Sequence, residues 1–261
     1  MQGTPTISLI TVCFQAEAYL KSCIDSIIAQ DYPSIEYIII DGGSTDGTLD
    51  IIRAYEQHID QWVSERDEGL YDAMNKGICM ASGEVIGFLH ADDVYEHPSV
   101  ISTVMKAFED SSIGAVYGDL VYVDAENTDY ITRYYPARDF TVSKFRKGMM
   151  PPHPTFFVRT SLYEKMGNFD TSYEICADFD LMVRMLYQGQ VSSSYIPSVL
   201  VRMRNGGIST RNLSSTITIN REMLKACKKY GLNTNFLLIY SKYFSKISQL
   251  FMRPESSITH T

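Results

Sequence analysis

Apolar and polar positions follow two alternating patterns over roughly the first hundred residues. Continuous apolar runs rich in β-branched residues are typical of strands covered on both faces, and they occur at 7–13, 35–41, 60–65 and 84–89. Between these runs, apolar residues recur every three or four positions, which predicts helices at 17–30, 49–58 and 69–82. This alternation indicates an α/β fold with a Rossmann-like, mostly parallel central sheet flanked by helices.

After about residue 110 the pattern becomes mixed, with strands and helices of α+β character. Two short strands are expected within 113–124, on either side of Gly118 and Asp119, and further strands at 128–136 and 191–204. A strand and a helix are expected within 153–167. A helix is expected at 178–189, with four residues facing inward: Leu181, Met182, Met185 and Leu186.

These changes of pattern divide the chain. We expect one domain over 1–210, with halves of about 1–110 and 111–210, and a C-terminal helical extension over 211–261. Near the end, one helix is expected to carry an apolar stripe of Phe236, Ile239, Tyr240, Tyr243, Phe244, Ile247, Leu250 and Phe251, with Ser241, Lys242, Ser245, Lys246 and Gln249 on its other face. The simpler interpretation is a helix packed on its own domain or on a second copy in a homodimer. The alternative is a helix in the headgroup region of a membrane.

Composition narrows the class of protein. The chain has 261 residues and a net charge of -8, which argues against nucleic acid as a partner because a phosphate backbone selects basic surfaces. Its five cysteines are scattered with no C-x-x-C pair, so neither a zinc site nor a disulfide framework is expected. No signal-peptide pattern and no run of ~18–20 apolar residues is present, so we expect a cytoplasmic protein.

Acidic residues gather where the predicted strands end. Asp41 ends one strand, with Asp46 beyond it as an expected helix cap or turn residue. The next two strands are followed by Glu65, Arg66 and Asp67, and by His90, Asp92 and Asp93. Because the carboxyl ends of parallel strands meet at one edge, where ligands bind, these side chains are expected to converge. Converging carboxylates repel one another, so a divalent cation or a hydrogen-bonding ligand is needed to offset the repulsion.

The adjacent acids Asp92 and Asp93 favour a site for Mn²⁺ or Mg²⁺. These ions prefer carboxylate oxygen, and Mg²⁺ often binds through one or two carboxylates together with substrate phosphates. The alternative is that one of the two acids only begins the helix expected near Pro98.

Other phosphate-binding and hydrolytic motifs are absent from the sequence. There is no G-x-x-x-x-G-K-[ST] loop, and the first strand–helix turn, "TVCFQAEAY", contains no glycine. There is also no G-x-S-x-G elbow of an α/β hydrolase. Phosphates would therefore be neutralised by a metal ion and side chains rather than by a glycine-rich cradle.

Four stretches carry a family resemblance: "ISLITVCFQAEAYLKSCIDSIIAQDYP", "IEYIIIDGGSTDGT", "RDEGLYDAMNKGICMASGEVIGFLHADD" and "ADFDLMVRM". Each is loose alone, but in this order and spacing they resemble the family 2 glycosyltransferases of GT-A fold, over about residues 6–210. The resemblance is strongest to the bacterial branch that assembles exopolysaccharide and O-antigen repeat units. It implies a nucleotide-sugar-binding first half and a catalytic, acceptor-binding second half.

The resemblance implies a set of donor-binding residues. Thr11 and Asp41 would hold the nucleobase, with Phe14 and Glu17 nearby. Arg66, Asp67 and Lys76 would border the nucleotide, although Lys76 could instead be a solvated helix residue. In the D-x-D element, His90 replaces the first acid; Asp92 would bind the metal and touch the nucleotide, and Asp93 would be a second metal ligand.

The resemblance also implies a catalytic base. In "CADFDL" the base position is Asp178, and Ala177 replaces the first acid of the usual pair. Asp180 is the helix neighbour of Asp178 and a weaker candidate for the acceptor or diphosphate side. The alternative for Asp178 is a helix N-cap. The Q-x-x-R-W signature of processive enzymes is absent, so transfer of one sugar per acceptor is expected.

Two loops are weaker candidates for the acceptor or diphosphate side. His153 lies between prolines in "PPHP", where a purely structural histidine is an equal alternative. Arg202 and Arg204 precede the Gly206–Gly207 pair, which in related enzymes belongs to a loop that closes over the diphosphate.

The implied reaction is a metal-dependent, inverting displacement. The donor would be a nucleoside-diphosphate sugar, UDP- or dTDP-linked by family analogy, and the acceptor a glycan hydroxyl, carried on a lipid diphosphate. The enzyme would then lie in the cytoplasm, with peripheral contact at the plasma membrane as an open alternative. A nucleotidyltransferase and a non-catalytic sugar-nucleotide-binding protein are the rival functions. The first should show a glycine-rich basic loop after the first strand, and the second has no need of Asp92, Asp93 and Asp178.

Overall fold

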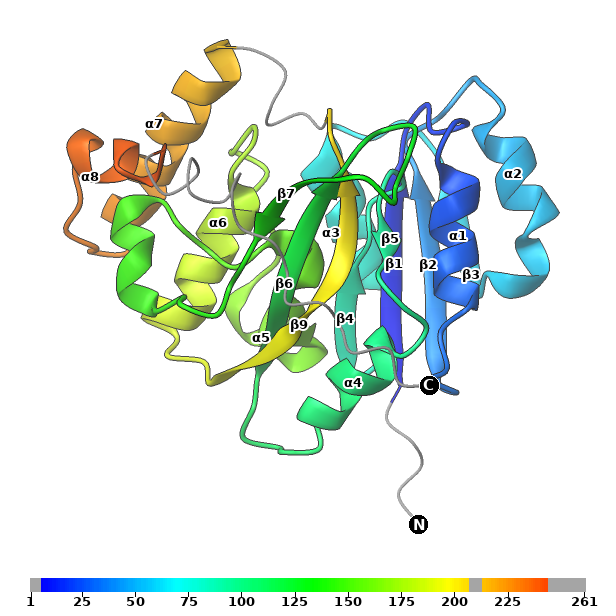
Figure 1. Ribbon diagram of the computed structural model, residues 1–261, viewed down its shortest axis with the longest axis horizontal. Helices are drawn as coiled ribbons and strands as arrows, with labels where there is room; N and C mark the ends of the chain where they lie inside the picture. The colour runs from blue at the N-terminus through cyan, green and yellow to red at the C-terminus, as the bar shows by residue number, and fades with distance from the viewer. Residues whose placement is uncertain (1–5, 207–212, 244–261) are drawn as a thin grey trace.

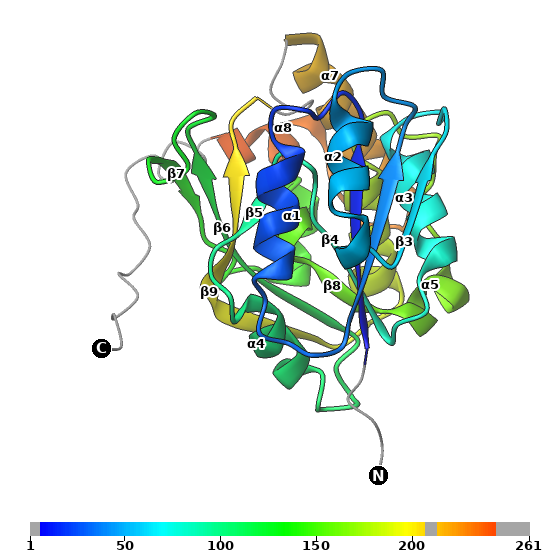
Figure 2. The same cartoon turned by 90° about the vertical axis from the view of Figure 1, so that its right-hand side faces the viewer.

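The computed structural model describes residues 6–206 and 213–243. Over these residues nine strands form one sheet in the order β3-β2-β1-β4-β8-β6-β9-β5, with β7 paired to β6 (Figure 1). The first half supplies β1 (Ile7–Cys13), β2 (Ile35–Asp41), β3 (Gln61–Ser64) and β4 (Val85–Phe88), which pair in parallel. Their carboxyl ends meet at one edge of the sheet, at the top of Figure 2, as the sequence pattern predicts.

The second half extends the same sheet with mixed pairing. β8 (Phe157–Arg159) is antiparallel to both β4 and β6 (Ala115–Val123), and so joins the two halves. β9 (Ser193–Arg204) is parallel to β6, while β7 (Ile131–Tyr135) and β5 (Val94–Tyr95) add antiparallel pairs.

The expectation of two short strands around Gly118 is wrong, because β6 runs through this position without a break. What changes at Gly118 and Asp119 is the register of β6 against β9. A Cβ atom on Gly118 would lie 2.6 Å from the side chain of Leu200 in β9, so glycine permits this close approach. The glycine therefore marks an irregularity inside a strand rather than the end of one.

Helices cover both faces of the sheet (Figures 1 and 2). One face packs against α1 (Leu20–Ile28), α2 (Thr48–Ala54) and α4 (Val100–Ala107), and the short η1 (Glu56–His58) follows α2. The other face packs against α3 (Leu70–Met80), α5 (Thr160–Met166) and α6 (Ala177–Met182), which continues as the π-helix η4 (Val183–Gln188). The four residues expected to face inward on α6 and η4 are all buried, which confirms that prediction.

The C-terminal helices α7 (Leu213–Lys229) and α8 (Phe236–Tyr240) pack on the second half, next to η2 (Val142–Lys147). Ile239 is fully buried, and Arg146 Nε donates to the carbonyl of Asn233 (2.7 Å). The expected stripe is wrong in its described part, because Phe236 and Tyr240 are exposed and Lys242 is buried. The residues expected to continue it, from Phe244 to Phe251, lie outside the described residues.

No helix among the described residues is long and apolar enough to cross a bilayer. A contact of the C-terminal helices with a membrane surface or with a second copy stays a prediction.

Candidate active site

Hydrogen bonds join the loops after β1 and β2 at the carboxyl edge of the sheet. The amides of Gln15 and Ala16 donate to the hydroxyls of Ser44 and Thr48 (both 2.8 Å). Glu17 accepts from the amide of Gly47 (3.1 Å), so its carboxylate fastens these loops to each other. These hydrogen bonds fix the backbone next to Phe14 at the ends of β1 and β2.

Asp41 and Thr11 are core residues in this structure. The Asp41 carboxylate is fully buried and accepts from the amides of Gly43 (3.1 Å) and Ser44 (2.9 Å) and from Ser64 Oγ (2.6 Å). It therefore shapes the loop after β2 rather than offering an open face to a base. Thr11 is also fully buried, and its hydroxyl accepts from Tyr37 (3.2 Å) on the α1 side of the sheet. The Thr11 side chain is therefore turned into the core, and the expected contact of this strand end with a nucleobase stays a prediction.

The exposed Phe14 and the half-buried Asp67 lie together on this rim. The Phe14 side chain is 62% exposed, although large apolar side chains are normally buried. A Cβ atom on Gly42 would lie 2.5 Å from Asp67 Oδ2 and 3.4 Å from the Phe14 ring, so both side chains flank the bare backbone of this glycine. Arg66 is exposed beside them. An open ring next to a carboxylate and an arginine is suited to stack and hydrogen-bond a nucleobase.

Lys76 of α3 is ion-paired rather than freely solvated. Its ammonium lies 2.9 Å from Glu65 and 3.3 Å from Asp72. The hydrogen bond to Glu65, followed by that to Asp72, raises the pKa of Lys76. Because two carboxylates already balance its charge, Lys76 has less positive potential to offer a diphosphate.

The carboxylates of Asp92 and Asp93 lie in different environments. Asp92 is partly exposed after β4, and no described residue donates a hydrogen bond to its carboxylate. Asp93 is fully buried, and neither carboxylate oxygen has a hydrogen-bond partner. Burial, and then the charge of Asp92, raises the pKa of Asp93 well above its ordinary value, although nearby Arg204 opposes this. Two buried carboxylate oxygens without a partner would be stabilised by a nearby cation, so Asp93 as a second ligand stays a prediction.

Arg204 of β9 braces the backbone that carries these acids. Its guanidinium donates to the backbone carbonyl of Asp92 (2.6 Å) and to Ser22 Oγ (3.1 Å), and it lies over the Tyr19 ring at 4.9 Å. The structure thus brings Arg204 to the predicted edge as a buried support of Asp92. Arg202, two residues earlier, is held elsewhere, because its guanidinium binds the carboxylate of Glu96 through two bonds of 2.6 and 2.8 Å. Its expected role beside the diphosphate is corrected to a link between β9 and the segment next to β5.

The fit of a divalent cation depends on Asp92. Within 6–206 and 213–243, no three or more His, Cys, Asp or Glu side chains are grouped so as to enclose a metal ion. A single open carboxylate still fits a cation whose remaining ligands are phosphate oxygens and water, as is usual for Mg²⁺. The residues present therefore suit a metal that arrives with a diphosphate.

A chain of aromatic rings joins this edge to the second half. His153, in η3 (His153–Thr155), lies with its ring centroid 5.9 Å from that of His90 and 5.8 Å from that of Phe169. Phe169 in turn stacks on Tyr71 of α3 at 5.6 Å. Burial, and then His90, lowers the pKa of His153 to about 3, so its imidazole is neutral at physiological pH. His153 thus lies next to the edge predicted to bind the donor.

Asp178 lies at the other end of this chain of rings. It is in the first turn of α6 but is not the N-cap, which is Cys176, so the N-cap interpretation of Asp178 is wrong. Its Oδ1 accepts from the amide of Phe179 (2.7 Å) and from the Tyr71 hydroxyl (3.4 Å). Burial raises the pKa of Asp178 from 3.8 to about 6, against the lowering effect of these two hydrogen bonds. A carboxylate with a pKa near the working pH has the property required of a general base.

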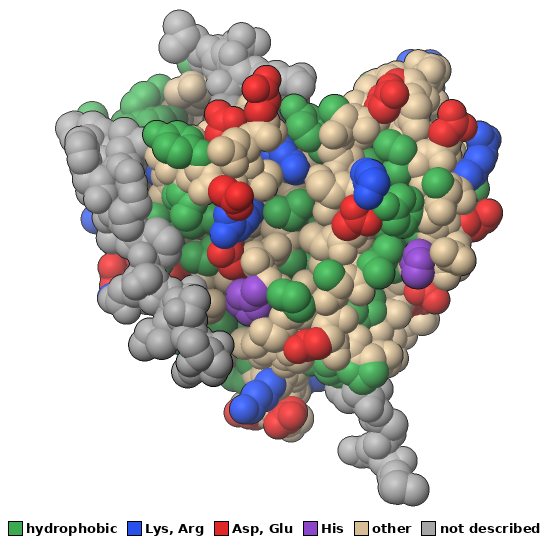
Figure 3. Space-filling view, turned by 45° about the vertical axis from the view of Figure 1, so that its right-hand side comes forward, with side chains coloured by type: hydrophobic (Ala, Val, Ile, Leu, Met, Phe, Trp, Pro, Cys, Tyr) green, Lys and Arg blue, Asp and Glu red, His purple; other side chains and the backbone are tan. Residues whose placement is uncertain are grey.

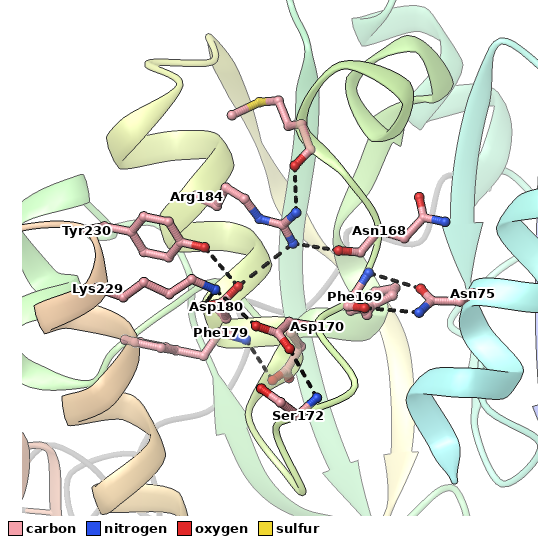
Figure 4. Close-up of polar contacts among 12 residues, drawn as sticks. Asn75, Asn168, Phe169, Asp170, Ser172, Phe179, Asp180, Arg184, Lys229 and Tyr230 are labelled. Carbon is pink, nitrogen blue, oxygen red and sulfur yellow. Dashed lines mark hydrogen bonds and ion pairs between the residues drawn. The ribbon is translucent and has the colours of Figure 1, made fainter. Parts of the chain in front are cut away.

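Asp180 is bound by side chains of α7 and η4. It is fully buried and binds Lys229 (3.1 Å) and Tyr230 (3.0 Å) of α7, with Arg184 at 3.8 Å (Figure 4). Its expected place on the acceptor or diphosphate side is therefore corrected.

Sequence reasoning missed Tyr71 and Glu222. Tyr71 stands in "GLYDAMNKG", one of the stretches that carry the family resemblance, but nothing in that stretch pairs it with Asp178. Glu222 lies on α7 and binds the backbone just before Asp178, and no local motif marks it.

In the space-filling view the outline is hollowed at the upper side, where the strands end, and acidic and basic side chains lie around the hollow (Figure 3).

The mixed sheet, with the carboxyl ends of β1–β4 at one edge and helices on both faces, has the GT-A fold of two solved structures. TarS of S. aureus, residues 1–349 in complex with UDP-GlcNAc, aligns with a TM-score of 0.67 at 16% identity, over 92% of this chain and 73% of that one. The mannosyltransferase PcManGT from Pyrobaculum calidifontis, in complex with GDP-Man and Mn²⁺, aligns with a TM-score of 0.65 at 19% identity, over 93% and 70%.

Sequence comparison gives the family. The model of "Glycosyl transferase family 2" matches residues 8–167. A glycosyltransferase of Mycobacterium tuberculosis is 35% identical over 186 residues, 70% of each chain. A PGL/p-HBAD biosynthesis glycosyltransferase of the same species is 30% identical over 227 residues, 85% of this chain and 84% of the relative. The chain belongs to glycosyltransferase family 2, and this excludes the nucleotidyltransferase alternative.

Proposed function

We propose that this glycosyltransferase is an inverting, metal-dependent enzyme. It transfers one sugar from a nucleoside-diphosphate donor to a hydroxyl of a lipid-linked glycan in the synthesis of a bacterial surface polysaccharide. The observation that carries this proposal is Asp178, a carboxylate of raised pKa that contacts Tyr71, whose ring is connected to the donor edge through Phe169 and His153.

In the proposed reaction Asp178 accepts the proton of the acceptor hydroxyl. The acceptor oxygen attacks the anomeric carbon while the bond from that carbon to the diphosphate oxygen breaks on the opposite face. The nucleoside diphosphate leaves with the bonding electron pair. One base without an enzymic nucleophile gives a single displacement, so the configuration at the anomeric carbon is inverted.

The donor half would bind the nucleotide along its rim. Phe14 would stack on the base, and Asp67 and Arg66 would contact the nucleoside. Asp92 would hold a divalent cation that, when bound, neutralises charge on the leaving diphosphate. The donors bound by TarS and PcManGT, and the Mn²⁺ in the latter, support this class of ligand. The mycobacterial relative is a glycosyltransferase of PGL/p-HBAD biosynthesis, which supports a biosynthetic role for this chain.

A thermal-shift screen of UDP-, dTDP- and GDP-sugars, each with and without Mn²⁺, tests the donor and metal assignments. We expect stabilisation by one nucleotide class, larger when the metal is present. Turnover of the selected donor, followed with wild type and Asp178→Asn, then tests the base. Equal turnover by the two proteins would remove Asp178 from the mechanism, and equal stabilisation with and without metal would remove the cation.

A further inference from the structure

Helix α7 grips the segment that carries Asp178. Along one face of α7, Lys225 binds Ser172 Oγ (3.3 Å) and Lys229 binds Asp170 (3.0 Å). Figure 4 shows Lys229 and Tyr230 reaching from α7 to Asp180 and Asp170. The segment from residue 170 to 180 is thus held by a helix far from it in the sequence.

On the same face of α7, Glu222 bonds the backbone immediately before Asp178. Its carboxylate accepts three consecutive backbone amides, those of Glu174 (2.7 Å), Ile175 (3.0 Å) and Cys176 (2.9 Å). No side chain caps the start of α6 locally, so Glu222 supplies acceptors that the segment itself lacks. Hydrogen bonds from backbone amides to a carboxylate are stronger than those between neutral groups.

The same peptide is held from the opposite side by α3. The Tyr71 hydroxyl donates to the carbonyl of Ile175 (2.5 Å) while lying 3.4 Å from Asp178 Oδ1. Ile175, three residues before Asp178, is therefore bound at its N–H by Glu222 of α7 and at its C=O by Tyr71 of α3. Such a two-sided contact fixes where α6 begins and hence where the Asp178 carboxylate lies.

Glu222 also acts on Asp178 through its charge, because its carboxylate raises the pKa of Asp178. The other titratable groups near Asp178 are Cys176 of its own loop, Tyr71 of α3 and Tyr135 of β7. The charge of Lys242 lowers the pKa of Cys176. Among them Glu222 is the acid that bonds the backbone beside Asp178 and also raises its pKa.

We propose that Glu222 is a positioning residue that holds Asp178 in place from the C-terminal helix. This inference rests on the proposed role of Asp178 as base. It extends the functional unit beyond residues 8–167, the range that the family model matches, to include α7.

The test compares wild type with Glu222→Gln, which keeps the size of the side chain but removes its charge and one acceptor. Glu174→Gln is the matched control, because Glu174 is exposed and its carboxylate makes no bond to the loop. The readouts are hydrogen exchange of the amides of 174–176 and the pH dependence of kcat/KM. The reaction is hydrolysis of the sugar nucleotide chosen by the thermal-shift screen.

In Glu222→Gln we expect these amides to exchange about tenfold faster and kcat to fall about ten- to hundredfold. The acidic limb of the pH profile should move to lower pH, since a charge that raises the pKa of Asp178 is gone. Donor affinity and the Glu174→Gln profile should match wild type. An unmoved limb, or unchanged exchange, would overturn the positioning role, because a purely structural defect lowers activity equally at every pH.

Two further variants keep the outcomes distinct. Asp178→Asn is measured in parallel, and if this variant retains wild-type turnover the proposed function fails. If Asp178→Asn loses turnover while Glu222→Gln behaves like wild type, only the positioning role is overturned. If Glu222→Gln does not fold, Glu222→Asp replaces it, with the charge kept and the reach shortened. That variant should show faster exchange with an unmoved limb, and wild-type exchange would refute the proposal.

Discussion

Replacing Asp178 with asparagine is expected to stabilise the protein at neutral pH while abolishing transfer. The pKa of Asp178 is raised from 3.8 to about 6 by burial, so the folded protein pays to ionise this group. A shift of this size corresponds to about 3 kcal/mol when the group is fully ionised. Asparagine removes the charge and retains an oxygen that can accept from Phe179 and Tyr71. We therefore expect a gain of about 2–3 kcal/mol in the free energy of unfolding.

The sign and the pH window follow from linkage. Because the folded pKa lies above the unfolded pKa, the folded protein holds the proton more tightly. Well below pH 3.8 the group is protonated in both states and the charge costs nothing. The cost grows between 3.8 and about 6 and is complete above that range. The stability difference between wild type and Asp178→Asn should therefore be small at pH 4 and largest at pH 7.

Urea unfolding of both proteins at pH 4 and pH 7 measures this difference. Asp170→Asn is the matched control: burial pushes the pKa of Asp170 up, but hydrogen bonds from Ser172 and Lys229 bring it down to about 2. Removing that carboxylate should destabilise the protein at pH 7, the opposite sign. The reasoning fails if Asp178→Asn is less stable than wild type at pH 7, or if its effect is the same at both pH values.

Three other outcomes are expected. Phe14→Ala should weaken donor binding by about five- to a hundredfold, since base stacking on an aromatic ring is worth about 1–3 kcal/mol; unchanged affinity by calorimetry would place the base elsewhere. Asp92→Asn should remove the Mn²⁺-dependent part of the thermal shift with the donor, and an intact metal effect would contradict its role as ligand. Asp180→Asn should cost about 3 kcal/mol in urea unfolding, because Lys229 and Arg184 lose a buried partner, yet donor affinity should stay at the wild-type value.

The strands could be predicted closely from the sequence because their burial is continuous. The runs at 7–13 and 35–41 coincide with β1 and β2, since each residue from Ile7 to Cys13 is buried, as are the last five of β2. Helix ends were less predictable. The first helix starts at Leu20 rather than at residue 17, because Glu17 belongs to the preceding loop and its carboxylate accepts from the amide of Gly47. Periodicity reports the apolar face of a helix but not which polar residues at its ends are used by a neighbouring loop.

The sequence predicted which loops meet at the carboxyl edge, but not the surroundings of each side chain. The rule that ligands bind at strand ends selected the loops of Phe14, Asp67 and Asp92, which lie at that edge in the structure. It could not tell that Thr11 faces α1, because a strand buried on both faces shows no alternation of apolar and polar residues. Glu222 left no signal at all, since its partners are backbone amides 46 to 48 residues away.

The pairing of β4 with β8 makes one uninterrupted sheet of both halves. A fragment ending near residue 110 would lose β8 and leave β4 as an unprotected edge, which invites aggregation. Neither half should thus be obtainable alone in monomeric form. Chimaeras that exchange the second half between relatives would have to preserve the junction of Val85 and Ile86 with Arg159 and Val158, whatever sugar they are built to transfer.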